Sequence, residues 1–182
     1  MESPIPKRLS RKQMQLQAAS GLSAFGRGEE ARLSPRSKYL NACIQANVMP
    51  RQALVNKVTE LTINVQNQGL GDRMCRMFMD CYRDSASVQT VNLTDNNLTD
   101  VGLAPAIAAV SCIPTVTLLD LSENIMGPRA AEALLSFLDT DHCPLRALVI
   151  RKCALDDLHC QCFVAALLRE SHFSNLVDLN LS

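Results

Sequence analysis

The stretch that decides the fold is VNLTDNNL at residues 91–98, where apolar and polar residues alternate before a pair of asparagines. Similar stretches recur along the chain, each placed within a unit that repeats every 28 to 31 residues. Self-similarity at such a period is typical of proteins built from stacked structural repeats. The other copies are INVQNQGL at 63–70, LDLSENIM at 119–126, LVIRKCAL at 148–155 and an incomplete LVDLNL at 176–181.

Each unit predicts a short strand followed by a helix. Apolar residues two positions apart, such as Val91 and Leu93, favour a strand with one buried face. Counted from unit openings at residues 60, 88, 116 and 145, positions 16, 19, 20 and 23 are nearly all apolar. That spacing gives one face of an α-helix. These helix residues are Cys75, Phe78, Met79 and Tyr82; Leu103, Ala106, Ile107 and Val110; Ala131, Leu134, Leu135 and Leu138; and Cys160, Phe163, Val164 and Leu167.

The boundaries of these elements are also marked in the sequence. Position 13 holds residues suited to a helix start: Asp72, Asp100, Pro128 and Asp157. Position 9, where the chain leaves the strand, holds Gln68, Asn96, Asn124 and Cys153. An amide there can satisfy backbone groups inside the coil, and we expect these four residues to form a structural Asn/Cys ladder.

The pattern L-x-x-L-x-L-x-x-N/C-x-L resembles that of leucine-rich repeats, over residues 58–182. A strand plus a helix in each unit resembles the ribonuclease-inhibitor-like subfamily. The resemblance implies an α/β leucine-rich-repeat solenoid, a right-handed β–α horseshoe with parallel strands on its concave face. It implies four units and a truncated fifth. Because the chain stops in mid-repeat without a polar terminal cap, we expect a fragment, a truncated isoform or an incomplete gene model.

Charge divides the chain into two parts. Residues 1–57 hold ten Lys and Arg and three Asp and Glu, whereas the remainder holds eight and fifteen. We expect a basic, disordered arm over residues 1–33 and a helical lead-in, or N-terminal cap, over 34–57. In this lead-in Tyr39, Leu40, Cys43, Ile44 and Val48 are expected to cover the open end of the first repeat.

The best candidate for a functional site is the outward side of the strands and the loop that follows them, since repeat proteins bind partners on such a surface. The candidate partner-binding residues are Thr62, Asn64, Gln66, Thr90, Asn92, Thr94, Asp95, Leu118, Asp120, Ser122, Glu123, Arg151 and Lys152.

Catalytic and metal chemistry find little support in the sequence. His142, Cys143, Cys153, His159, Cys160, Cys162 and His172 gather in the last third, but they lack the paired Cys spacing of zinc sites. His159 next to Cys160 does not provide the geometry of a nucleophile and its base. The glycine pairs at residues 26–28 and 69–71 lack the remaining residues of a phosphate loop. We therefore expect no enzyme activity, no cofactor and no metal.

Function is predicted at the level of class. We expect a non-catalytic protein-interaction scaffold, monomeric or part of a larger chain; the alternative is a regulator of a small GTPase, since Ran-type activators resemble this architecture. Specific nucleic-acid binding is disfavoured because the arm has few aromatic residues. No apolar run is long enough to cross a membrane. Without a signal peptide a cytoplasmic location is expected, although a basic, acid-poor N-terminus also fits an organellar transit peptide.

Overall fold

A computed structural model describes residues 33–56, 61–140, 142–155, 157, 158, 161 and 178–180. The chain divides into two compact units, Met1–Ser34 and Pro35–Ser182. The fold below is that of the second unit. The expected basic arm, apart from Leu33, lies outside the described residues, as do most of the helix expected in the fourth repeat and its apolar positions from Cys160 to Leu167.

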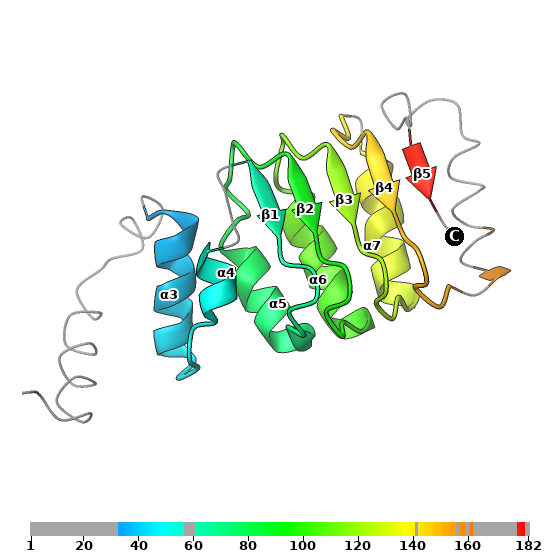
Figure 1. Cartoon of the computed structure of the whole chain (residues 1–182). Coiled ribbons are helices and arrows are strands. Elements are labelled where there is room, and N and C mark those ends of the chain that lie inside the picture. The colour runs from blue at the N-terminus through cyan, green and yellow to red at the C-terminus, as the bar shows by residue number, and fades with distance from the viewer. Residues whose placement is uncertain are drawn as a thin grey trace, which may run out of the picture. The chain divides into compact units, whose positions relative to one another are not determined.

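Strands and helices alternate along the repeats (Figure 1). The strands β1 (Thr62–Asn64), β2 (Thr90–Asn92), β3 (Leu118–Asp120), β4 (Ala147–Val149) and β5 (Asp178–Asn180) form one parallel sheet in chain order. Helices α5 (Gly71–Asp80), α6 (Asp100–Val110) and α7 (Pro128–Leu138) connect successive strands and lie behind the sheet in the view of Figure 1. Parallel strands require such crossover connections. The sequence prediction of an α/β repeat fold with parallel strands is therefore confirmed.

Register between strands is set by the repeat itself. Ile63 pairs with Val91, Val91 with Leu119 and Leu119 with Leu148, so equivalent residues stand side by side. Each of these central residues is fully buried, whereas its two strand neighbours are half-buried. Because side chains alternate across a strand, one face of the sheet is packed and the other is left accessible.

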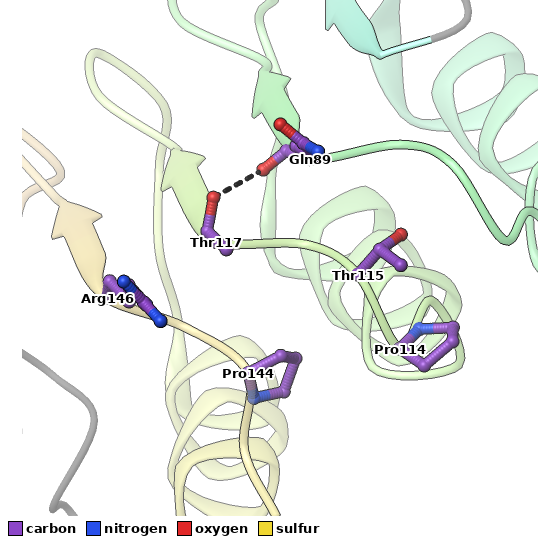
Figure 2. A pocket seen from close by; sticks show the side chains of 6 residues that line it. All are labelled: Gln89, Pro114, Thr115, Thr117, Pro144 and Arg146. Atoms are coloured by element: carbon purple, nitrogen blue, oxygen red, sulfur yellow. Dashed lines mark hydrogen bonds between the residues drawn. The ribbon is translucent and has the colours of Figure 1, made fainter.

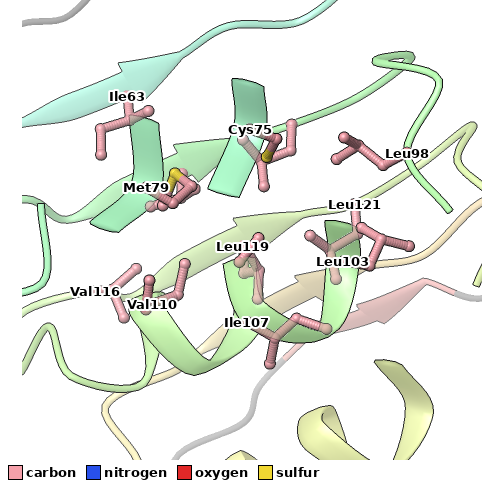
Figure 3. Close-up of a cluster of buried hydrophobic side chains, with 14 of the residues drawn as sticks. Ile63, Cys75, Met79, Leu98, Leu103, Ile107, Val110, Val116, Leu119 and Leu121 are labelled. Atoms are coloured by element: carbon pink, nitrogen blue, oxygen red, sulfur yellow. The ribbon is translucent and has the colours of Figure 1, made fainter. Parts of the chain in front are cut away.

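The core lies between the strands and the helices (Figure 3). The apolar positions expected on the first two helices are all buried, including Phe78 and Ile107, although Tyr82 lies in the turn beyond the end of α5. On α7 the expected face is buried except Leu135, which is half-buried. Burial of aliphatic side chains stabilises such a fold by roughly 25 cal/mol per Å² of apolar area removed from water.

The segment before the first strand contains two helices, α3 (Pro35–Gln45) and α4 (Gln52–Asn56). Tyr39 packs its ring edge-on against Phe78 of α5, with ring centroids 5.5 Å apart. Its hydroxyl accepts a hydrogen bond from the backbone N–H of Arg51 at 3.0 Å. Arg51 in turn donates through Nη1 to the carbonyls of Gln68 and Gly69 in the first repeat. The lead-in is thus tied to the first repeat by an aromatic contact and an arginine.

One expectation for the lead-in is wrong. Tyr39 and Cys43 are buried and Leu40 and Val48 are half-buried, but the Ile44 side chain is 48% exposed. Ile44 follows Cys43 directly on α3, and adjacent residues point about 100° apart around a helix, so the buried face does not include both.

Helix starts are linked from one repeat to the next. The Asp72 carboxylate accepts hydrogen bonds from the backbone N–H of Thr99 at 2.8 Å and from its hydroxyl at 2.6 Å. Asp100 accepts from the N–H of Ala130 at 2.7 Å. Glycines permit this close approach, because a Cβ on Gly102 would lie 2.3 Å from Asp72 Oδ1 and one on Gly127 would lie 2.7 Å from Asp100 Cγ. Carboxylates at helix N-termini are favourable, so two of the predicted helix-start residues also hold neighbouring repeats together.

Candidate functional site

The accessible side of the sheet, opposite the helices, carries the first and third residue of every strand; we call it the outer sheet face. From β1 to β4 these residues are all half-buried, which leaves part of each side chain open to a partner. β5 extends the face by two residues that the sequence interpretation did not include, since its repeat is incomplete. The outer sheet face consists of Thr62, Asn64, Thr90, Asn92, Leu118, Asp120, Ala147, Val149, Asp178 and Asn180.

Three polar residues on this face also build the turns that follow the strands. The side-chain Oδ1 of Asn92 accepts the backbone N–H of Thr94 at 2.9 Å, and Oδ1 of Asp120 accepts that of Ser122 at 3.0 Å. Asn64 makes the corresponding contact at 3.4 Å. Asn and Asp commonly form such turns with the backbone two residues on. Their orientation is therefore fixed before any partner arrives, a role that the sequence interpretation missed.

The loops after the strands supply the charged residues of the candidate site. Gln66, Asp95, Glu123, Arg151 and Lys152 are exposed. Lys152 Nζ lies 3.6 Å from Glu123 Oε1, so these two charges on neighbouring repeats form an ion pair. An exposed pair contributes little to stability. The other candidate charges, Asp95, Asp120 and Arg151, have no ion-pair partner among the residues that the structure describes.

Ser122 is a correction to the predicted site. Its side chain is 1% exposed, and its hydroxyl accepts the backbone N–H of Arg151 at 3.1 Å. Thr94, at the same position of the preceding unit, is half-buried, and its hydroxyl oxygen is buried without a hydrogen-bond partner among the described residues. The short Ser122 side chain is used to join adjacent repeats and is not available to a partner.

The loop conformation is repeated as closely as the strands. Asn67, Asp95, Glu123 and Lys152, at position 8 of the four units, all have positive φ, between 49° and 57°. Asn and Asp tolerate this left-handed conformation better than other non-glycine residues do. Glu123 and Lys152 are therefore held in a strained conformation by the surrounding repeat, which presents their side chains in a defined direction.

Two asparagines connect adjacent coils from inside. Asn124 donates through Nδ2 to the carbonyls of Leu93, Leu121 and Ser122 at 2.9–3.0 Å. Its Oδ1 accepts the N–H groups of Asn96 and Leu98, both at 3.1 Å. Asn96 makes the equivalent set of contacts one repeat earlier. Each amide thus contacts five backbone groups, and its Oδ1 satisfies two N–H groups of the interior.

The first and last residues of the predicted Asn/Cys ladder, Gln68 and Cys153, make different contacts from the two asparagines between them. Cys153 is buried, and its thiol donates to the carbonyl of Leu121 at 3.3 Å. Gln68 is half-buried, and its amide donates to the carbonyls of Gln66 and Asn67 within its own loop. The longer Gln side chain therefore reaches the loop carbonyls and not the interior.

Five of the six described cysteines are buried in the core, whereas Cys112 is exposed. Burial raises the pKa of the Cys75 thiol to about 12, with the nearby Asp72 carboxylate adding to the effect. Burial raises the pKa of Cys81 to about 12 and also raises that of Cys153. A thiol with a raised pKa is a poor nucleophile at neutral pH. His159, Cys160, Cys162 and His172 lie outside the described residues.

Within the described part of the chain, no group of three or more His, Cys, Asp or Glu side chains is placed to hold a metal ion. In the same residues, no helix has the length and apolar character to cross a bilayer.

Comparison with known proteins agrees with the repeat. The family model described as Leucine Rich repeat matches residues 84–105, which contain β2, its following loop and the first half of α6. No curated protein matches the chain. The match supports a leucine-rich-repeat protein. Repeats of this family generally mediate protein–protein interaction and are typically non-enzymatic.

Proposed function

We propose that this chain is a non-catalytic protein-interaction scaffold that binds a protein partner on its outer sheet face. In this proposal the repeats form a right-handed horseshoe of the ribonuclease-inhibitor-like kind, and the outer sheet face is its concave side. The assignment to this subfamily and the horseshoe curvature of the repeats are proposed together with the function. Binding on this face would use side chains drawn from every repeat at once, as repeat proteins commonly do.

The observation that carries the proposal is the in-register pairing of short parallel strands with one accessible face. Equivalent residues form columns across the sheet, such as Asn64, Asn92 and Asp120. Their side chains are already oriented by hydrogen bonds to the backbone, which reduces the entropy lost on binding. The face also mixes polar, apolar and charged residues, a composition that suits a protein interface.

The experiment is an affinity purification with matched variants of the full chain. The face variant combines Leu118→Arg on the outer sheet face with Arg151→Glu on the loop that follows β4. Asp120 is kept because its carboxylate supports a turn. The control variant combines Arg76→Glu and Glu132→Arg, two exposed side chains on α5 and α7. We expect a partner that the native chain and the control both recover, and that the face variant loses without a change in circular dichroism. Equal recovery by all three would contradict binding on this face.

The same experiment separates the scaffold from the regulator of a small GTPase. A small GTPase recovered through the outer sheet face would be tested for phosphate release with and without the chain. Faster release that the face variant abolishes would favour the regulator. An unchanged rate would leave the scaffold as the function of this surface.

A further inference from the structure

A hollow of about 390 Å³ opens beside the start of the strands, at a place the candidate site did not include. It is lined by side chains from the approaches to β2, β3 and β4, as Figure 2 shows. The lining residues are Gln89, Pro114, Thr115, Thr117, Pro144 and Arg146. Three successive repeats therefore contribute to one concave site.

Most of the backbone around the hollow is already paired. The carbonyl of Gln89 accepts the hydroxyl of Thr117 at 3.2 Å and two backbone N–H groups (Figure 2). Thr115 donates its hydroxyl to the carbonyl of Val88 at 2.7 Å. The carbonyl of Thr117 accepts the N–H groups of Arg146 and Ala147. The hollow therefore has few open acceptors, and both threonine hydroxyl protons are in use.

What remains for a ligand is one guanidinium and one side-chain amide. The exposed Arg146 guanidinium and the exposed Gln89 amide have no hydrogen-bond or ion-pair partner in the part of the chain that the structure describes. A guanidinium presents its donors in a planar fork that matches the two oxygens of a carboxylate. Pro114 and Pro144 supply rigid walls, because the ring fixes the backbone at each of these positions.

The strand residues that directly follow the lining residues Thr117 and Arg146 in the chain are apolar. Leu118 follows Thr117, and Ala147 follows Arg146, at the first positions of β3 and β4. Leu118 pairs with Ala147 in the sheet, and Val149 lies two residues further along β4. All three are half-buried. These apolar side chains belong to the outer sheet face, on the two strands whose approaches carry Thr117 and Arg146.

We propose that this hollow is a carboxylate-binding site for the protein partner, which inserts an Asp or Glu side chain against Arg146 and Gln89. An apolar side chain beside that acid packs on Leu118, Ala147 and Val149. The inference rests on the proposed function and specifies the chemistry of the partner. A single guanidinium with an amide suits one carboxylate, whereas nucleic-acid backbones are neutralised by many cations together.

The test uses peptides displayed at random and selected on the immobilised full chain. Selected peptides are expected to carry Asp or Glu next to an apolar residue. The chain variant Arg146→Gln should weaken such a peptide by about tenfold, the range of a charge-assisted hydrogen bond at a partly exposed site. A Glu→Gln change in the peptide should have the same effect. The matched control Arg76→Gln, on the exposed side of α5, should have none.

A charge swap separates a loss of peptide binding from a loss of folding in the variant chain. Arg146→Glu should abolish binding of the acidic peptide and restore it when the peptide acid is changed to Arg. Selected peptides that lack an acid, or whose binding is unchanged by Arg146→Gln, would overturn the carboxylate site. If the face variant still abolished the binding of those peptides, binding on the outer sheet face would stand. Peptides insensitive to both variants would overturn the site and the proposed function together.

Discussion

At the scale of single residues, the amides inside the coil are the contacts on which each repeat depends. We predict that Asn124→Ala lowers the free energy of unfolding by about 3 kcal/mol, because it leaves the N–H groups of Asn96 and Leu98 without the acceptor that they have inside the coil. Asn124→Cys should cost less, since Cys153 occupies the same position of the next repeat. Urea unfolding monitored by circular dichroism measures both. Equal losses for the two variants would contradict this role.

The left-handed loop residues give a prediction of the opposite sign. Ala154 has φ of 51°, whereas the first repeat has Gly69 at the same position with φ of 52°. Ala154→Gly should raise the free energy of unfolding by about 0.5–1 kcal/mol, because glycine adopts this conformation without a steric penalty. The control Ala108→Gly, within α6, should lower it by about 1 kcal/mol. Thermal unfolding of the two variants would refute the account if both were destabilised.

Residue roles were only partly predictable from the sequence. The spacing alone singled out Asn96 and Asn124, because a polar residue recurs where the apolar alternation ends. It gave no sign that Ser122 is buried, since that depends on a contact with Arg151 in the next repeat. The hollow around Arg146 was missed for a similar reason: its lining residues are far apart in sequence and meet only when the repeats stack.

At the scale of elements, α5 makes the fold sensitive to alkali. Folding raises the pKa of Cys75 from 9.0 to about 12. The neutral thiol is thus favoured in the folded state, so its contribution is fully present below pH 9 and is lost as the pH rises toward 12. We predict that the urea midpoint falls between pH 9 and 12. Cys75→Ala should make the urea midpoint fall less steeply with pH, because about one proton fewer is then released on unfolding. An unchanged slope would contradict this role of Cys75.

Contacts between helix starts give a second prediction at this scale. Alanine is a better helix former than glycine by about 1 kcal/mol, yet Gly102→Ala should destabilise the protein by about 1–2 kcal/mol. The added Cβ would lie 2.7 Å from the Asp72 Cα, and crowding of this kind outweighs the gain in helix propensity. Chemical denaturation provides the measurement, and a more stable Gly102→Ala protein would show that α5 and α6 can separate without cost.

The elements themselves followed from the sequence wherever the periodicity was strong. The apolar positions of α5, α6 and the strands were predicted correctly because a core face imposes its spacing on the residues. The lead-in was predicted less well, because its exposed Ile44 could not be distinguished from a core residue by its apolar side chain alone. Arg51, which ties the lead-in to the first repeat, gave no sequence signal.

At the scale of the whole repeat array, strand order is a consequence of the repeated unit. Helices α5, α6 and α7 each return the chain beside the strand before it, and the strands from β1 to β5 lie in chain order in the sheet. The helices cover one face, and the outer sheet face gathers equivalent residues into columns. We propose that a protein partner binds to these columns.

Site-specific photo-cross-linking tests that claim most directly. A benzophenone amino acid would replace Thr90 on the outer sheet face in one chain and Arg76 on α5 in another, and both would be irradiated in source cells. We predict that the chain labelled at Thr90 becomes linked to the partner recovered by the native chain, whereas the chain labelled at Arg76 does not. Cross-links to that partner from Arg76 and none from Thr90 would place the interface on the helices and contradict the account.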